Sequence, residues 1–352
     1  MSKEFKRLTI VEKSKLNMDE LCEYERDRRD YLANNNKKLK GVVFRKIVHP
    51  VINAAIKSRR LKLKQTLTVY NEVKKVNRPI IFSVTHTGKY DIEIVNEAIK
   101  KSYYLLSDDE EYMYRTVDGY FTIVNGVIYV DSDFKNDMLN AKKISKKVLN
   151  QNGNIMWYPE GIWNLSPNSL ILPCRYGIIE TAVETNALIL PIAIDQKGND
   201  FYVNIGEYIY PEEFNLKGLD DKEGKINGIN LLRDKMATLK WEIWEKQGVV
   251  SRDTIPFGYQ EKYVREKIAE WPYLSEQAIE KRIYHPTNMT NIEDVLSEPI
   301  IRNKKELESE KEKLYQIATL LEKDSNLSYE EAERIVLQSK NNNKKYVKQL
   351  KR

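Results

Sequence analysis

The chain has 352 residues, of which 41% are hydrophobic, so it is long enough for one large domain with extensions or for two domains. No run approaches the ~20 apolar residues of a membrane span, and the first residues lack the apolar core of a secretory signal. The two cysteines are too few for a disulfide framework and fit a reducing compartment. We therefore expect a cytoplasmic protein, or one that binds a membrane peripherally.

Residues 1–75 are polar and charged, and we expect them to form a mostly helical N-terminal region. The net charge of +6 is unevenly distributed: the segment 31–71 contains no Asp or Glu. Apolar residues recur through this segment at helical spacing, and Pro50 predicts a break or a new helix start there. Its basic residues are Lys37, Lys38, Lys40, Arg45, Lys46, Lys57, Arg59, Arg60, Lys62 and Lys64.

A basic face beside an apolar stripe is typical of an interfacial helix on anionic lipid. The alternative is a surface helix that packs on the main domain and exposes its charges to water. Nucleic-acid binding is a third interpretation, but no recognisable binding module surrounds the segment, so we expect no nucleic-acid partner.

From residue 76 to residue 257, strand-like runs alternate with helical patterns. This alternation predicts an α/β fold, with a mixed, largely parallel sheet flanked by helices. Residues 258–352 have helical patterns only and predict a helical C-terminal extension. The expected strands are 79–84, 102–106, 121–130, 154–158, 188–194 and 201–206, and the expected helices are 92–101, 136–149, 177–185 and 227–246.

The sequence has three histidines, and His86 stands where a strand gives way to a helix, five positions before Asp91. A neutral imidazole is well suited to take a proton from a hydroxyl group, and a carboxylate on its other nitrogen fixes the tautomer. The spacing also fits a structural histidine beside a helix cap. No metal site is expected, because His49, His86 and His285 are far apart and no Cys/His ligand spacing occurs.

A second candidate segment is a strand that ends in Pro159, Glu160 and Gly161. Such a turn presents a carboxylate at the edge of the sheet, and we expect the Gly161 amide to be open to a substrate oxygen. An ordinary turn, with Trp163 as a core or edge aromatic residue, is the alternative.

Taken together, these motifs resemble those of the glycerolipid acyltransferase superfamily, whose best-known members are the 1-acylglycerol-3-phosphate acyltransferases. The resemblance covers roughly residues 76–210. Residues 86–91 match the His-four-residues-Asp motif, 126–131 resemble the second block, 158–161 the third, and Pro191 lies in the fourth. Arg175 precedes a glycine where family members carry a basic residue.

The resemblance implies acyl transfer from acyl-CoA or acyl carrier protein, as co-substrate, to a hydroxyl acceptor, with no cofactor. His86 would be the general base and Asp91 its orienting partner. Direct attack by the acceptor is expected, since no residue stands out as a nucleophile. Substrate-binding residues would be Lys89, Gly126, Pro159, Glu160, Gly161, Trp163 and Arg175.

Two departures from the family pattern concern the acceptor. Ser132 and Trp163 stand where the family usually has arginines that are expected to hold a phosphate, and neither side chain is charged. The acceptor is therefore expected to be a lysophospholipid-like molecule without that phosphate contact, or a glycan or glycolipid precursor. A catalytically idle lipid- or partner-binding relative and a thioesterase remain as alternatives. We expect the protein to act on the inner face of a membrane.

Overall fold

The computed structural model describes residues 5–39, 41–107, 113–114, 117–130, 134–164 and 170–249, together with residues 331, 334 and 335. Its strands are β1 (Thr66–Tyr70), β2 (Ile80–Val84), β3 (Tyr104–Ser107), β4 (Val127–Tyr129), β5 (Ile155–Trp157), β6 (Leu188–Lys197) and β7 (Asp200–Ile205). Its helices are α1 (Ile10–Lys13), α2 (Met18–Asn34), α3 (Gly41–Lys62), α4 (Asp91–Ile99), α6 (Val117–Asn125), α7 (Lys135–Asn150), α8 (Gly177–Thr185) and α9 (Lys222–Lys246), with the 3-10 helix η1 (Pro211–Phe214).

The seven strands form one sheet in the order β1-β7-β6-β2-β5-β3-β4. Every pair is parallel except β6 and β7, which form an antiparallel hairpin. Strand β2 is central and lies between β5 and β6, and all five of its residues are buried. The predicted fold class, a mixed and largely parallel sheet flanked by helices, is confirmed.

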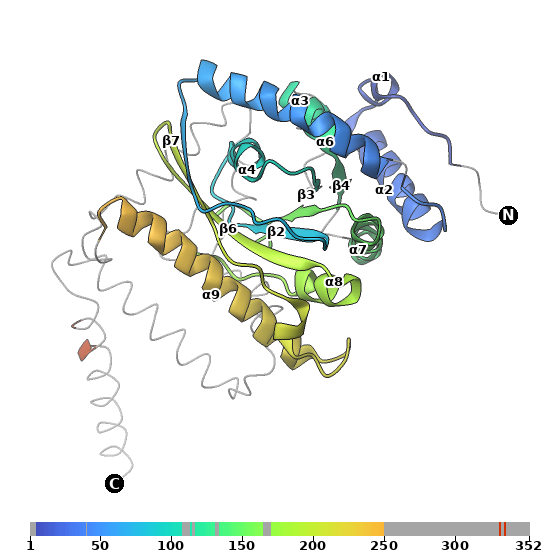
Figure 1. The fold of residues 1–352 in the computed structure, drawn as a ribbon. Coiled ribbons are helices and arrows are strands. Elements are labelled where there is room, and N and C mark those ends of the chain that lie inside the picture. Colours follow the sequence, from blue (N-terminus) through green and yellow to red (C-terminus); the bar gives the residue numbers. More distant parts are fainter. Residues whose placement is uncertain are drawn as a thin grey trace, which may run out of the picture.

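Helices cover both faces of the sheet (Figure 1). Helix α4 packs on one face with Phe82 and Val84 of β2, and helices α7, α8 and α9 pack on the other face with Ile81. The alternation along β2 follows from the pleat, which sends successive side chains to opposite faces. Because both faces are buried, the strand is a continuous apolar run, and its carboxyl end carries the loop that contains His86.

The N-terminal helices lie against this domain. Helix α2 packs beside α7, and α3 crosses above α4 (Figure 1). Two ion pairs hold α3 to α4, one between Arg59 and Glu93 and one between Arg60 and Glu97. Part of the predicted basic face therefore binds carboxylates of the main domain.

Two expectations from the sequence were wrong in detail. Helix α3 continues through Pro50 without a break in its assignment. Residues 121–125 belong to helix α6, so only the end of the expected strand 121–130 is a strand, β4. The region up to residue 75 contains the helices α1, α2 and α3 and also the edge strand β1, which pairs with β7. The predicted C-terminal helices lie almost wholly outside the described residues.

Candidate active site

The loop after β2 brings His86 and Asp91 together. The Nδ1 atom of His86 lies 2.9 Å from Oδ2 of Asp91, the first residue of α4. Because a carboxylate only accepts hydrogen bonds, Nδ1 carries the proton, and the neutral ring has its lone pair on Nε2. The His86 side chain is 19% exposed, whereas that of Asp91 is 1% exposed. The arrangement therefore leaves a basic nitrogen on a ring that is not sealed in the interior.

The carboxylate of Asp91 is fixed by further donors. The backbone amides of Thr87 and Gly88 donate to Oδ2, and the Thr87 hydroxyl donates to Oδ1 at 2.8 Å. Each of these bonds favours the charged form of the carboxylate. Thr87, which the sequence reasoning missed, lies inside the His-four-residues-Asp spacing, and its hydroxyl was the available indication.

The segment after β5 encloses the imidazole of His86. The Tyr158 ring stacks on it with centroids 4.3 Å apart, and the Trp163 ring meets it edge-on at 5.9 Å. The backbone amide of Asn164 donates to the His86 carbonyl at 2.7 Å. Trp163 is therefore a neighbour of the candidate base, although its side chain is mostly buried.

Glu160 also contacts His86, through the main chain. Its Oε1 accepts the backbone N–H of His86 at 2.9 Å, and its Oε2 accepts the N–H of Leu172 at 2.8 Å. Burial raises the pKa of Glu160 to about 7, although these two amides and the charge of Lys240 act in the opposite direction. Leu172 has no motif around it that would have revealed this contact from the sequence.

The Pro159-Glu160-Gly161 turn has a different role for its glycine from the one expected. Gly161 adopts a φ of 75°, which glycine tolerates well, and its amide donates to the Tyr158 carbonyl at 3.1 Å. The expectation that this amide is open to a substrate was wrong, because it closes the turn. The Pro159 carbonyl accepts the backbone N–H of Arg175 at 3.0 Å.

Two cations lie close to these loops. The Arg175 side chain is exposed, and its Nε lies 3.6 Å from where a side chain at Gly161 would begin. Lys89 lies inside the His86–Asp91 loop, with Nζ 5.3 Å from the centroid of the Tyr90 ring. Arg175 therefore presents a guanidinium beside the Pro-Glu-Gly turn.

Gly126 lies away from this group. It immediately precedes β4, which runs parallel to β3, β5 and β2. Gly126 therefore lies at the amino ends of these strands, whereas His86 follows their carboxyl ends. There it packs against Arg45, whose Nε would be 2.5 Å from an added Cβ. The structure thus does not bring Gly126 together with the other predicted substrate-binding residues. Asp131 and Ser132 lie outside the described residues.

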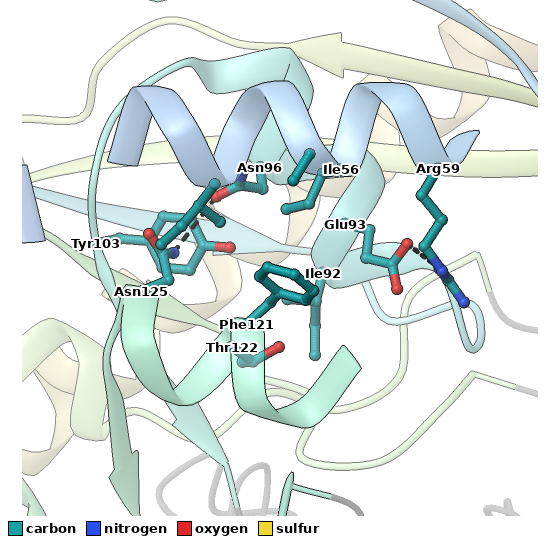
Figure 2. Close-up of a pocket in the computed structure, with 11 residues that line it drawn as sticks. Ile56, Arg59, Ile92, Glu93, Asn96, Tyr103, Phe121, Thr122 and Asn125 are labelled. Carbon is teal, nitrogen blue, oxygen red and sulfur yellow. Dashed lines mark hydrogen bonds and ion pairs between the residues drawn. The ribbon is translucent and has the colours of Figure 1, made fainter. Parts of the chain in front are cut away.

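A cavity of about 110 Å³ lies between α3, α4 and α6 (Figure 2). Ile56, Ile92 and Phe121 give it apolar walls, and Asn96, Asn125 and Tyr103 give it a polar end. A cavity of ~150 Å³ holds benzene, so this smaller one is too small for a whole fatty chain. Neither His86 nor Asp91 lines it.

Comparison with known proteins finds similarity to acyltransferases. Residues 66–195 match the family model described as Acyltransferase. An uncharacterized acyltransferase of Schizosaccharomyces pombe is 24% identical over 132 residues, which are 37% of this chain and 47% of that protein. The chain thus spans about half of the length of this relative. The crystal structure of the 1-acyl-sn-glycerophosphate (LPA) acyltransferase PlsC from Thermotoga maritima is 16% identical, with a TM-score of 0.44, over 69% of this chain and 89% of that one.

The chain carries an acyltransferase domain. This similarity agrees with the resemblance of its motifs to those of the glycerolipid acyltransferase superfamily.

Proposed function

We propose that the protein is an O-acyltransferase that moves an acyl group from acyl-CoA or acyl carrier protein to a hydroxyl acceptor. The observation that carries this proposal is the 2.9 Å contact between His86 Nδ1 and Asp91, on a ring that remains partly exposed. An imidazole held in this way is suited to general-base chemistry.

The reaction needs no enzyme nucleophile. As the acceptor oxygen attacks the thioester carbonyl, Nε2 of His86 takes the hydroxyl proton and a tetrahedral intermediate forms. The intermediate collapses, the carbon–sulfur bond breaks, and the thiol leaves with the proton that the imidazolium returns. Asp91 stabilises the imidazolium between these two proton transfers. Ser83 is no alternative nucleophile, because it is buried and its hydroxyl donates to the sulfur of Met236.

The acceptor is a hydroxyl-bearing lipid or a glycan or glycolipid precursor. Trp163 beside His86 supplies an apolar edge rather than a charge, which favours a sugar ring or an acyl chain. Arg175 is the exposed cation by the Pro-Glu-Gly turn and is placed to attract an anionic part of a substrate.

The activity test measures thiol release and the fate of the acyl group separately. Purified protein is given palmitoyl-CoA with monoacylglycerol or lysophosphatidate, and lipid products are identified by mass spectrometry. Acylated acceptor together with free CoA supports the proposal. Free fatty acid alone identifies a thioesterase, and thiol release no greater than that of a His86→Ala variant counts against catalysis with these two acceptors.

Contact with an anionic membrane surface is the second part of the proposal. Val43, Phe44, Ile47 and Val51 all point outward from α3, and Ile47 and Val51 are 70% and 72% exposed. Lys46 and Lys57 are exposed on the same helix. An outward apolar stripe flanked by lysines fits the interface of a bilayer that contains anionic lipid. No helix in the described part of the chain combines the length and apolarity that are needed to cross a bilayer.

Vesicle binding tests this contact. With phosphatidylglycerol–phosphatidylcholine vesicles, Ile47→Glu is expected to reduce co-sedimentation about tenfold or more. Leu139→Glu is the matched control, because Leu139 is an exposed leucine on α7 and its change is expected to leave binding within about twofold of the original. Equal binding by the Ile47→Glu variant would remove α3 as the contact surface.

A further inference from the structure

The carboxylate of Glu160 is buried and bonded to the main chain. The residue is 6% exposed. Its Oε1 accepts the backbone N–H of His86, and its Oε2 accepts the backbone N–H of Leu172. A carboxylate whose two oxygens face the protein main chain has little left to offer an acceptor molecule.

We propose that Glu160 is a positioning residue, which holds the main chain of His86 in place for proton transfer and does not contact substrate. This inference rests on the proposed acyltransferase function. The main chain of His86 is held at both of its polar groups by one segment: Glu160 accepts from its N–H, and the amide of Asn164 donates to its carbonyl. These two hydrogen bonds, which we call the clasp, hold the loop after β2 to the segment after β5. Tyr158 and Trp163 of the same segment contact the imidazole ring of His86.

The geometry favours an ionised carboxylate. Two amide donors face two oxygens, so both oxygens must accept. A glutamine side chain has a single acceptor oxygen, and its amino group would face the second donor. A protonated glutamate is weakened less severely, because its hydroxyl oxygen is a poorer acceptor and its hydrogen must point away from the facing amide. In both cases His86 is expected to shift, and a displacement of ~1 Å at a reacting group costs ~100-fold in rate.

The surroundings make this clasp sensitive to pH. Burial raises the pKa of Glu160 to about 7, and the charge of Asp91 acts in the same direction. The His86 and Leu172 amides and the Lys240 ammonium from α9, which pairs with Asp195, act in the opposite direction. Cys174 also faces Glu160, but burial raises the pKa of its thiol, so it stays neutral. Glu160 is thus about half ionised near pH 7, so the clasp is strengthened as the pH rises above this value and weakened as it falls below it.

Steady-state kinetics with palmitoyl-CoA and monoacylglycerol separate positioning from substrate binding. Glu160→Gln is expected to lower kcat about 100-fold and to leave the KM for the acceptor within about twofold. Arg175→Ala is the comparison variant and is expected to raise a KM instead. If Glu160→Gln raises the acceptor KM with kcat unchanged, Glu160 binds substrate and the proposal is overturned.

The pH profile gives a second kinetic readout. The ratio of the original kcat to that of Glu160→Gln is expected to shrink as the pH falls from 8.5 to 5.5, because protonation weakens the clasp only where the glutamate is present. Glu160→Asp retains the charge on a shorter side chain, so a loss of about tenfold that keeps the pH dependence is expected. A ratio that is constant across this range counts against a titrating clasp at Glu160.

A readout without turnover keeps this inference distinguishable from the proposed function. The ¹⁵N spectrum of the imidazole rings, with His86 assigned from a His86→Gln variant, reports the environment of Nδ1 directly. Glu160→Gln is expected to move the His86 signals and to leave those of His49 in place. Unchanged His86 signals overturn the positioning role even if the protein transfers acyl groups. If the His86 signals move but the protein transfers no acyl groups, the positioning role of Glu160 is supported and the acyltransferase function is rejected.

Discussion

Two histidines of this chain have similar hydrogen bonds and different surroundings. His86 pairs Nδ1 with Asp91 at 2.9 Å, and His49 of α3 pairs Nδ1 with the side-chain oxygen of Asn125 at 3.0 Å. His49 is 4% exposed, and its Nε2 is buried without a hydrogen-bond partner. Burial lowers the pKa of His49, and the hydrogen bond with Asn125 only partly opposes this.

The difference between these sites lies in the charge of the partner and the access to the second nitrogen. A carboxylate stabilises an imidazolium as it forms, while an amide oxygen does so weakly and leaves burial in control. His49 belongs to a polar cluster that joins three helices, since Asn125 of α6 also donates to Asn96 of α4 at 3.4 Å. The same side chain therefore works as a candidate base in one place and as a packing element in the other.

The largest effect is expected when the imidazole of His86 is removed. His86→Ala should lower acyl transfer about 1,000-fold or more, because general-base catalysis contributes ~10²–10⁴-fold. Thiol release from palmitoyl-CoA in the presence of acceptor measures it. His49→Gln is the control and should retain activity within about threefold. Equal losses in these two variants would falsify the distinction between the two histidines.

A smaller loss is expected when only the charge of the partner changes. Asp91→Asn should lower kcat about 100-fold, because a neutral amide stabilises the imidazolium only weakly. Its amino group would also face N–H groups that donate hydrogen bonds to the carboxylate of Asp91. Circular dichroism and thermal unfolding check that the variant remains folded. A folded Asp91→Asn protein with the original kcat would show that the carboxylate does not assist His86.

The hydroxyl of Thr87 offers a finer change at the same site. Thr87→Val keeps the shape of the side chain and removes the hydroxyl that donates to Asp91 Oδ1. The Asp91 carboxylate keeps its hydrogen bonds from the Thr87 and Gly88 amides to Oδ2. A hydrogen bond to a charged group contributes ~1.5–3 kcal/mol, and partial compensation should limit the loss of kcat to about fivefold. Kinetics at saturating acceptor measure it, with Thr68→Val on the exposed edge strand β1 as a control that should show no change.

The sequence was most informative where residue pattern and topology agree. The apolar run of β2 and the helix that begins at Asp91 place His86 at a strand end, so the pair was predictable from the chain alone. Residues 121–125 were misassigned because branched and aromatic side chains read as a strand, whereas tertiary packing of α6 against α3 stabilises a helix there.

Other features of the site depend on directions in space that spacing does not encode. The sequence placed Glu160 at a turn but gave no indication that its two oxygens face the amides of His86 and Leu172. The same holds for Gly126, which matched a motif but lies at the amino ends of the strands, away from His86. Motif spacing thus predicts which loops gather, and the structure is needed to show which atoms meet.

The smallest effect on turnover, and a distinct one on stability, is expected at His49. Its pKa in the folded protein is below the ordinary value of 6.5, so between these two values the unfolded chain binds more protons. Its contribution to stability is therefore present above pH ~6.5 and is lost as the pH falls towards the folded pKa.

Urea unfolding from pH 7.5 to pH 5 should show the original protein losing stability relative to His49→Gln, which does not titrate. At pH 7.5 the variant itself should be about 1–3 kcal/mol less stable if the substitution leaves Asn125 unpaired. A stability difference that stays constant over this pH range would mean that His49 keeps its ordinary pKa in the fold and that burial does not distinguish it from an exposed imidazole.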